Sequence, residues 1–117
     1  MNKFSVGVNP TAATETVVFE VPDHQKIVIH QIMMSNHTGN NNTADLWWEH
    51  GHDASHDLYL VDDKSFAVGE LYNLNQIELV MRQGDKLKVL TEAASHFSVI
   101  VTFDIFPDNA QLDNFNP

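Results

Sequence analysis

The sequence predicts an all-β fold, an antiparallel β-sandwich or jelly roll formed by a single domain. Apolar and polar residues alternate with a period of two in most segments, which is the pattern of strands with one buried face. Turn-forming residues separate these segments, and no window of a dozen residues has the apolar spacing of an amphipathic helix. A chain of 117 residues, of which 43% are hydrophobic, is long enough for one independent core.

The alternation is clearest in the segment 96–106, where apolar residues at every second position share one face. Shorter runs of the same kind predict strands at 15–21, 44–50, 76–81 and 85–91. The segment 26–35 is apolar on both faces for part of its length, with Ile27 and Ile29 on one face and Val28, Ile32 and Met34 on the other. We therefore expect a central strand there, covered on its second face by a partner sheet or a second subunit.

The pattern divides the chain into a β-sandwich domain at residues 1–106 and an extended polar C-terminal arm at residues 107–117. Leu112 and Phe115 are isolated apolar residues in this arm, which has too little apolar surface to order itself. Two interpretations stay open: a frayed tail, or an arm that places these two side chains in a groove of a neighbouring subunit.

Composition excludes several classes of function. There are 16 acidic and 6 basic side chains, so the net charge is -10, and nucleic acids and anionic membranes are poor partners. The absence of cysteine excludes disulfides, thiolate metal sites and a cysteine nucleophile. The amino terminus lacks the layout of a signal peptide, and no stretch reaches the roughly 20 apolar residues of a membrane helix, so we expect a soluble chain made without a secretion signal.

Four motifs follow one another in a characteristic order. A strand ending in Val-Pro spans 16–22, and an apolar strand that begins with Lys and ends with Asn spans 26–36. A segment leading into a Gly-Asp turn spans 76–88, and a long alternating strand closes the pattern at 97–105. This order resembles that of small structural proteins of tailed bacteriophages, and the resemblance covers roughly residues 15–106.

The resemblance implies a β-sandwich component of the virion that acts as an oligomer. Capsid decoration (cement) proteins and neck or tail accessory proteins are the members it suggests. The implied partners are the major capsid protein or tail and neck proteins, and the implied location is the virion, after synthesis in the host cytoplasm.

The segment 49–57, Glu-His-Gly-His-Asp-Ala-Ser-His-Asp, is the candidate for metal chemistry. In a strand His50 and His52 point to the same side, and His56 with a neighbouring carboxylate could complete a site for zinc, nickel or copper. The spacing from His52 to His56 matches a zinc-protease helix, but Asp replaces the general-base Glu and Gly51 argues against a helix. We favour a polar loop without metal or cofactor, and we keep a pH-sensitive or metal-sensitive subunit contact as the functional alternative.

Trp47 and Trp48 point to opposite faces of one strand. Trp48 has the parity of Leu46 and is the core candidate, whereas Trp47 lies on the outer face. We therefore expect Trp47 to be an exposed interface anchor, with partial cover by a loop of the same subunit as the alternative. The interface candidates are Trp47, Met33, Leu112 and Phe115.

The leading hypothesis is a non-enzymatic virion protein that clamps neighbouring capsid subunits through oligomeric contacts. The sequence has no nucleophile elbow and no Gly-rich phosphate loop, so we predict no enzymatic activity. One alternative is a neck, tail or fibre accessory protein with a carbohydrate-binding surface, in which Trp47, Tyr59 and Tyr72 form a stacking platform. A cupin-like metal enzyme using His50, His52 and His56 ranks last.

Overall fold

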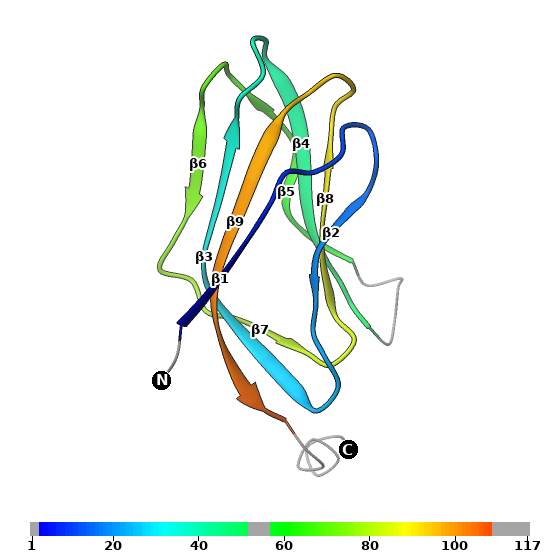
Figure 1. The fold of residues 1–117 in the computed structure, drawn as a ribbon, viewed down its shortest axis with the longest axis vertical. Coiled ribbons are helices and arrows are strands. Elements are labelled where there is room, and N and C mark those ends of the chain that lie inside the picture. Colours follow the sequence, from blue (N-terminus) through cyan, green and yellow to red (C-terminus); the bar gives the residue numbers. More distant parts are fainter. Residues whose placement is uncertain (1–2, 52–56, 109–117) are drawn as a thin grey trace.

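The computed structural model describes residues 3–51 and 57–108, which form nine strands and no helix (Figure 1). No helix in these two segments is therefore long and apolar enough to cross a membrane. The strands are β1 (Lys3–Val8), β2 (Thr16–Glu20), β3 (Gln25–Asn36), β4 (Asn42–Glu49), β5 (Leu58–Phe66), β6 (Leu71–Leu74), β7 (Leu79–Arg82), β8 (Lys86–Thr91) and β9 (Phe97–Pro107).

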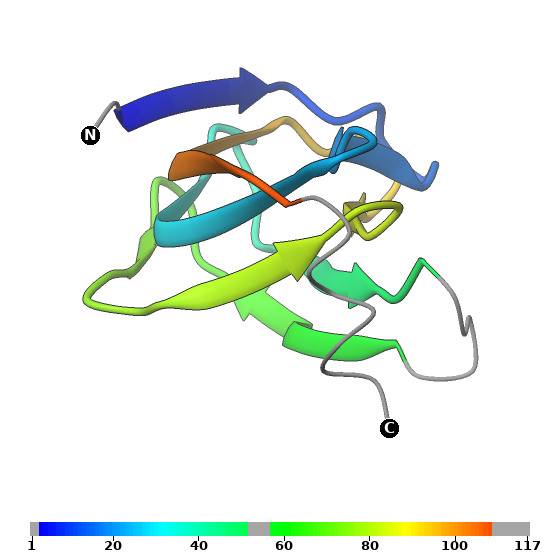
Figure 2. The same ribbon diagram turned by 90° about the horizontal axis from the view of Figure 1, so that it is seen from below.

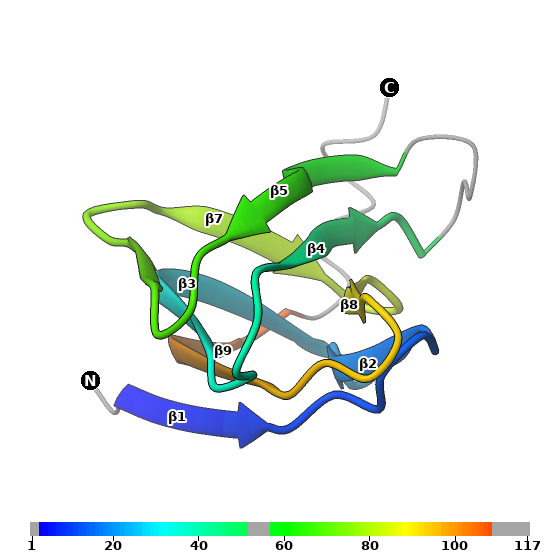
Figure 3. The same ribbon diagram turned by 90° about the horizontal axis from the view of Figure 1, so that it is seen from above.

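The strands form two antiparallel sheets packed as a sandwich. Sheet A has the order β1-β9-β3-β6, with β7 also paired to β3, and sheet B has the order β2-β8-β4-β5. Views from the two ends of the molecule show the two layers (Figures 2 and 3). Along the chain, β1 to β4 belong alternately to sheet A and sheet B, and each of them pairs with strands from the second half of the chain. This is the jelly-roll arrangement. The predicted fold class is confirmed.

The core lies between the sheets and consists of the inward side chains of both. Its largest fully buried members include Phe66, Phe97, Ile29, Ile32, Met34, Leu46, Met81 and Leu87. Phe66 and Phe97 meet edge to face, with ring centroids 5.2 Å apart, and so join β5 of sheet B to β9 of sheet A. The strand β9 contributes alternate residues to this core, as its sequence pattern predicts.

A β-bulge explains the unusual pattern of β3. Its register with β9 shifts between Ile29 and Gln31, so the alternation restarts there and Ile32 and Met34 face the core together with Ile29. The expectation that Ile32 and Met34 lie on the second face is therefore wrong. The strand is central, as predicted, with β9 on one side and β6 and β7 on the other, and its outer side carries no covering sheet within the described residues.

Three strands of the structure, β1, β5 and β6, were not predicted from the sequence. β1 alternates apolar residues at Phe4, Val6 and Val8, a signal that was present but short. In β5 the alternation is interrupted, because the pairing with β4 shifts twice and Asp63 has a φ of 49°. The four-residue β6 is too short to carry a period of its own.

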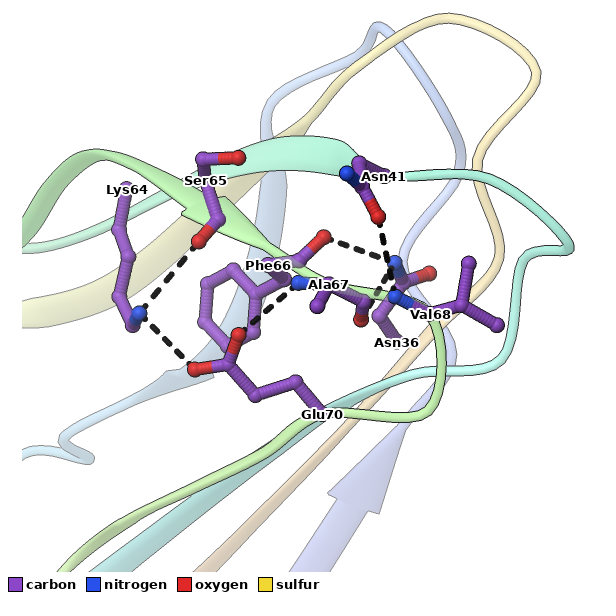
Figure 4. A network of polar contacts seen from close by, with 8 residues as sticks. All are labelled: Asn36, Asn41, Lys64, Ser65, Phe66, Ala67, Val68 and Glu70. Atoms are coloured by element: carbon purple, nitrogen blue, oxygen red, sulfur yellow. Dashed lines mark hydrogen bonds and ion pairs between the residues drawn. The ribbon is translucent and has the colours of Figure 1, made fainter.

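A buried asparagine joins the two sheets at the end of the sandwich where β3 ends (Figure 4). Asn36 is fully buried, and its Oδ1 accepts a hydrogen bond of 2.9 Å from the amide of Thr38. Its Nδ2 donates to the carbonyl oxygens of Asn40, Phe66 and Ala67, at 3.0, 3.2 and 3.2 Å. The side chain thus supplies the partners that the backbone of these turns lacks.

The β5–β6 turn beside Asn36 is closed by Glu70. One carboxylate oxygen accepts from the amide of Ala67 at 2.9 Å, and the other pairs with Lys64 at 3.0 Å (Figure 4). The Ala67 hydrogen bond, and then Lys64, lowers the pKa of Glu70. The amide of Val68 donates to Asn41 at 3.2 Å and ties this turn to the start of β4.

The Gly-Asp turn predicted between β7 and β8 is present and holds the chain that follows β4. The buried carboxylate of Asp85 accepts from the amides of Gly51 and Arg82, at 2.8 and 2.9 Å. Gly51 packs directly against this turn: a Cβ added there would lie 2.5 Å from the carbonyl carbon of Gly84 and 2.9 Å from the Asp85 nitrogen. A side chain at Gly51 therefore meets backbone that cannot rotate away.

Replacing Gly51 by alanine is expected to destabilise the fold by about 2 kcal/mol, because the turn must move to admit one methyl group. Urea unfolding followed by circular dichroism measures the change. Gly39→Ala is the matched control, because nothing lies within 4 Å of a Cβ built there. Equal stabilities for the two variants would show that the contact between Gly51 and Gly84 does not constrain the fold.

Candidate assembly surfaces

The outer side of sheet A, here called face A, carries exposed apolar side chains on its central strands. Met33 on β3 lies between Ile100 of β9 and Asn73 of β6, and Val28 lies beside Val80 of β7. Ile100 is 42% exposed and Val80 is 37% exposed. These side chains have the outward parity of their strands, so the protein's own core does not use them.

The charged groups of face A are mainly cations. Lys3, Lys26 and Arg82 have the outward parity, and Lys26 lies 5.8 Å from the centroid of the Phe106 ring. Arg82 pairs with Asp108 at 3.0 Å. The other carboxylate of face A, that of Asp104, is buried.

A histidine covers the carboxylate of Asp104. His30, in the β3 bulge, approaches the Oδ2 of Asp104 with its Nε2 at 2.7 Å, and Asp104 is only 2% exposed. The Oδ1 of Asp104 has no hydrogen-bond partner among the described residues. The carboxylate of Asp104 therefore lies beneath His30 and not at the solvent surface of face A.

The outer side of sheet B, here called face B, has an aromatic and aliphatic row that crosses all four strands. The row runs through Val17 of β2, Lys88 of β8, Trp47 of β4 and Tyr59 of β5. The rings of Trp47 and Tyr59 stack, with centroids 5.4 Å apart. Val17 and Tyr59 are 45% and 52% exposed, so both ends of the row are open to a partner.

Carboxylates surround this row. Glu49 pairs with Lys88 at 2.8 Å and with Lys86 at 3.9 Å, and Glu15 reaches Lys88 at 3.5 Å. The hydrogen bond that Lys88 donates to Glu49 is the first cause of a raised pKa of Lys88. Asp45 accepts a hydrogen bond from the backbone of the β5 bulge at Asp63.

The acids of face B also act on Tyr59. Partial burial of the ring raises the pKa of its hydroxyl above 10.0, and the negative charges of Asp45, Asp57, Asp62 and Glu15 raise it further. Burial is thus the first cause of the raised pKa, and the four carboxylates add to it at the exposed end of the row. The raised pKa also makes folding lose stability as the pH rises from the unfolded pKa of tyrosine towards the folded one.

We expect one of the two tyrosines to ionise late in an absorbance titration of the folded chain, and Tyr59→Phe to remove that late phase. Asp45→Asn should move the late phase towards the ordinary pKa of tyrosine, because it removes the carboxylate with the largest electrostatic effect on Tyr59. Asp23→Asn is the control, since Asp23 is not among the acids that act on Tyr59. If the late phase were unchanged in Asp45→Asn, the charge of Asp45 would not contribute to the raised pKa of Tyr59.

The structure places the predicted interface residues differently from one another. Met33 is half-buried on face A, which leaves it available to a partner. Trp47 has the predicted outward parity but is only 4% exposed, so the expectation of an exposed anchor is wrong. The cause is its own chain, because Tyr59 stacks on the indole. Trp48 packs against the core, as predicted.

Several candidate residues lie outside the described part of the chain: His52, His56, Leu112 and Phe115. His50 is described and lies 6.4 Å from the Trp48 ring, centroid to centroid. Among the described residues no group of three or more His, Asp or Glu side chains could hold a metal ion.

The predicted stacking platform does not form. Tyr72 lies on the core side of sheet A, where its ring meets Phe66 edge to face at 6.3 Å, whereas Tyr59 is on the opposite sheet. With Trp47 buried, Tyr59 is the one ring of the three that face B exposes.

The alternation at 15–21 places Val17 on the inward face together with Phe19 and Val21, and this expectation is wrong, because the register of β2 with β8 shifts between Val17 and Phe19 and leaves Val17 exposed. The exposed Ile100 was not singled out from the sequence. The signal for Ile100 was available, because it is an isoleucine at an outward position between Ser98 and Thr102. A large aliphatic side chain in the polar set of an alternating strand indicates a surface that contacts something.

Neither a protein-family model nor a curated protein matches the sequence. Solved structures share the fold. A chain from Bacillus endospore appendages, described as a novel family of disulfide-linked pili, superposes with a TM-score of 0.55 at 16% identity, over 92% of this chain and 87% of that chain. At this identity the likeness establishes the fold alone.

Two chains of infectious bursal disease virus also share the fold. The Gx strain chain has a TM-score of 0.54 at 9% identity, covering 94% of this chain and 32% of that chain. The chain of the T13 viral particle has a TM-score of 0.50 at 7% identity, covering 97% and 41%. The present chain thus spans less than half of either viral chain.

Proposed function

We propose that the chain is a non-enzymatic structural subunit of a virion, a capsid decoration (cement) protein that contacts neighbouring capsid subunits as an oligomer. The observation that carries the proposal is the presence of exposed apolar side chains on the outer faces of both sheets, at Ile100, Val80, Val17 and Tyr59. Apolar surface on a small soluble domain indicates a binding partner.

Three further features support this role. The jelly-roll fold occurs in chains of a viral particle, the sequence motifs resemble those of phage structural proteins, and many identical copies can build a firm attachment from modest contacts. In this proposal the partners are the major capsid protein and other copies of the chain, and the location is the virion after synthesis in the host cytoplasm.

A second candidate is a subunit of a surface or tail filament. The match to the endospore pilus chain favours it, because that match covers 87% of the other chain, whereas the viral matches cover less than half of theirs. Such a filament could not be linked by disulfides within these 117 residues, since they contain no cysteine.

Particles and filaments purified separately from the native source test both candidates. Mass spectrometry of each fraction detects the chain, and electron cryo-microscopy then locates its density. Density repeated over the head lattice supports the cement role, and density at the neck, tail or fibre supports a tail accessory role. Detection in the filament fraction alone supports the second candidate. Absence from both fractions would overturn the structural role.

A further inference from the structure

We infer that copies of this chain assemble head to tail, with face A of one copy packed on face B of the next. The inference rests on the proposed structural role and names the partner: a second copy of the same chain. Two independent properties of the faces carry it, their charges and their exposed apolar side chains.

The charges of the two faces are complementary. Face A presents Lys3, Lys26 and Arg82 against the carboxylate of Asp108, which pairs with Arg82, and its other acid, Asp104, is buried beneath His30. Face B presents carboxylates, which outnumber its lysines: Glu15, Glu20, Asp45 and Glu49 against Lys86 and Lys88. Two of these carboxylates, Asp45 and Glu15, add to the rise in the pKa of Tyr59 that burial of its ring causes first.

Complementary charge selects one pairing among three. Two A faces in contact bring lysine and arginine side chains together, and two B faces bring carboxylates together. Only A on B places opposite charges across the contact, and like charges brought together across an interface are unfavourable enough to disfavour the other two pairings. A chain with a net charge of -10 needs such local complementarity to associate with itself.

The apolar side chains occupy matching places on the two faces. On face A, Ile100 with Met33 and Val28 with Val80 form pairs across the central strands. On face B the row from Val17 to Tyr59 crosses the sheet. On face A charged residues flank the apolar ones, as in an interface with an apolar centre and a polar rim. On face B the exposed Val17 and Tyr59 lie at the two ends of the row, with Lys88 and the buried Trp47 between them. Tyr59 is the exposed aromatic and thus the expected hot spot.

An interface between two different faces has a topological consequence. In a stack of copies, one end has a free A face and the other end has a free B face. The assembly therefore grows until it closes into a ring or continues as a filament. Every internal copy therefore uses both faces, each with a different neighbouring copy.

Blocking each face separately tests the inference. Ile100→Asp puts a charge into the apolar centre of face A and leaves face B intact, and Tyr59→Asp does the reverse. Sedimentation velocity should show that wild type forms species larger than dimers, whereas each variant alone associates at least about tenfold more weakly. An equimolar mixture of the two variants should form a heterodimer that stops there, because one intact A face meets one intact B face.

Val68→Asp is the matched control, since Val68 is 58% exposed and lies in the β5–β6 turn, outside both faces. It should assemble like wild type. Circular dichroism and thermal unfolding show whether each variant folds. If either face variant does not fold, Val80→Asp and Val17→Asp provide the same pair of blocked faces.

Three results would overturn the inference: a wild-type chain that stays monomeric at millimolar concentration, one variant that still dimerises alone while the other does not, or a mixture that behaves as the sum of its parts. The second result would indicate an interface between two like faces. If the chain is found in particles, none of these results rejects its role as a structural subunit of the virion. Conversely, a heterodimer from the mixture combined with absence from particles and filaments would keep the inference and reject the function.

Discussion

Trp47→Ala should lower the free energy of unfolding of the isolated chain by about 3 kcal/mol, the cost of truncating a buried tryptophan. The indole is 4% exposed and stacks on Tyr59, so its removal leaves apolar surface uncovered in the folded monomer. Urea unfolding at a concentration where the wild type is monomeric measures the loss separately from any effect on assembly.

Leu58→Ala is the control for this measurement. Leu58 lies on the same strand as Tyr59 and is 54% exposed, so its truncation should cost less than about 1 kcal/mol. If Trp47→Ala unfolded like wild type but no longer assembled, the indole would be an interface anchor after all. The ring stack with Tyr59 would then be without energetic importance.

Asn36→Ala is expected to destabilise the fold by about 3 kcal/mol, because it leaves buried backbone groups of two turns without partners. Three carbonyl oxygens and one amide lose a hydrogen bond at once, and Asn36 itself is fully buried. The loss should appear as a lower urea midpoint with an unchanged slope, since the unfolded state is the same.

Two further variants identify the cause of that loss. Asn41→Ala removes one hydrogen bond, to the amide of Val68, from an exposed side chain and should cost about 0.5 kcal/mol. Asn36→Asp keeps the size but replaces the donor group by an acceptor that faces the same carbonyls, so it should be at least as damaging as alanine at neutral pH. An aspartate variant as stable as wild type would show that the amide donor is not what joins the turns.

The two tryptophans of β4 show what a local sequence pattern can and cannot predict. Alternation in β4 correctly assigned Trp48 to the core and Trp47 to the outer side, because the period of two depends on backbone geometry alone. Exposure does not follow from parity. It depends on Tyr59, which the β4–β5 pairing brings beside the indole and which no spacing rule relates to it.

The same distinction holds for β3. Its composition marked it as a central strand, and it is one. The faces of its second half were assigned wrongly, because a bulge between Ile29 and Gln31 adds a residue to one strand only and leaves no mark in the sequence of that strand. The bulge also places His30 against Asp104.

The sequence by itself determined the class of fold, the Gly-Asp turn before β8 and the absence of cysteine chemistry, because strand periodicity, turn propensity and composition are local properties. Only the tertiary structure decided which strands share a sheet, and therefore which charges share a face. Acidic residues from β2 and β4 gather on face B, and basic residues from β1, β3 and β7 gather on face A, through pairings between segments far apart in the chain. Such pairings depend on how the whole core packs, and no single segment specifies them.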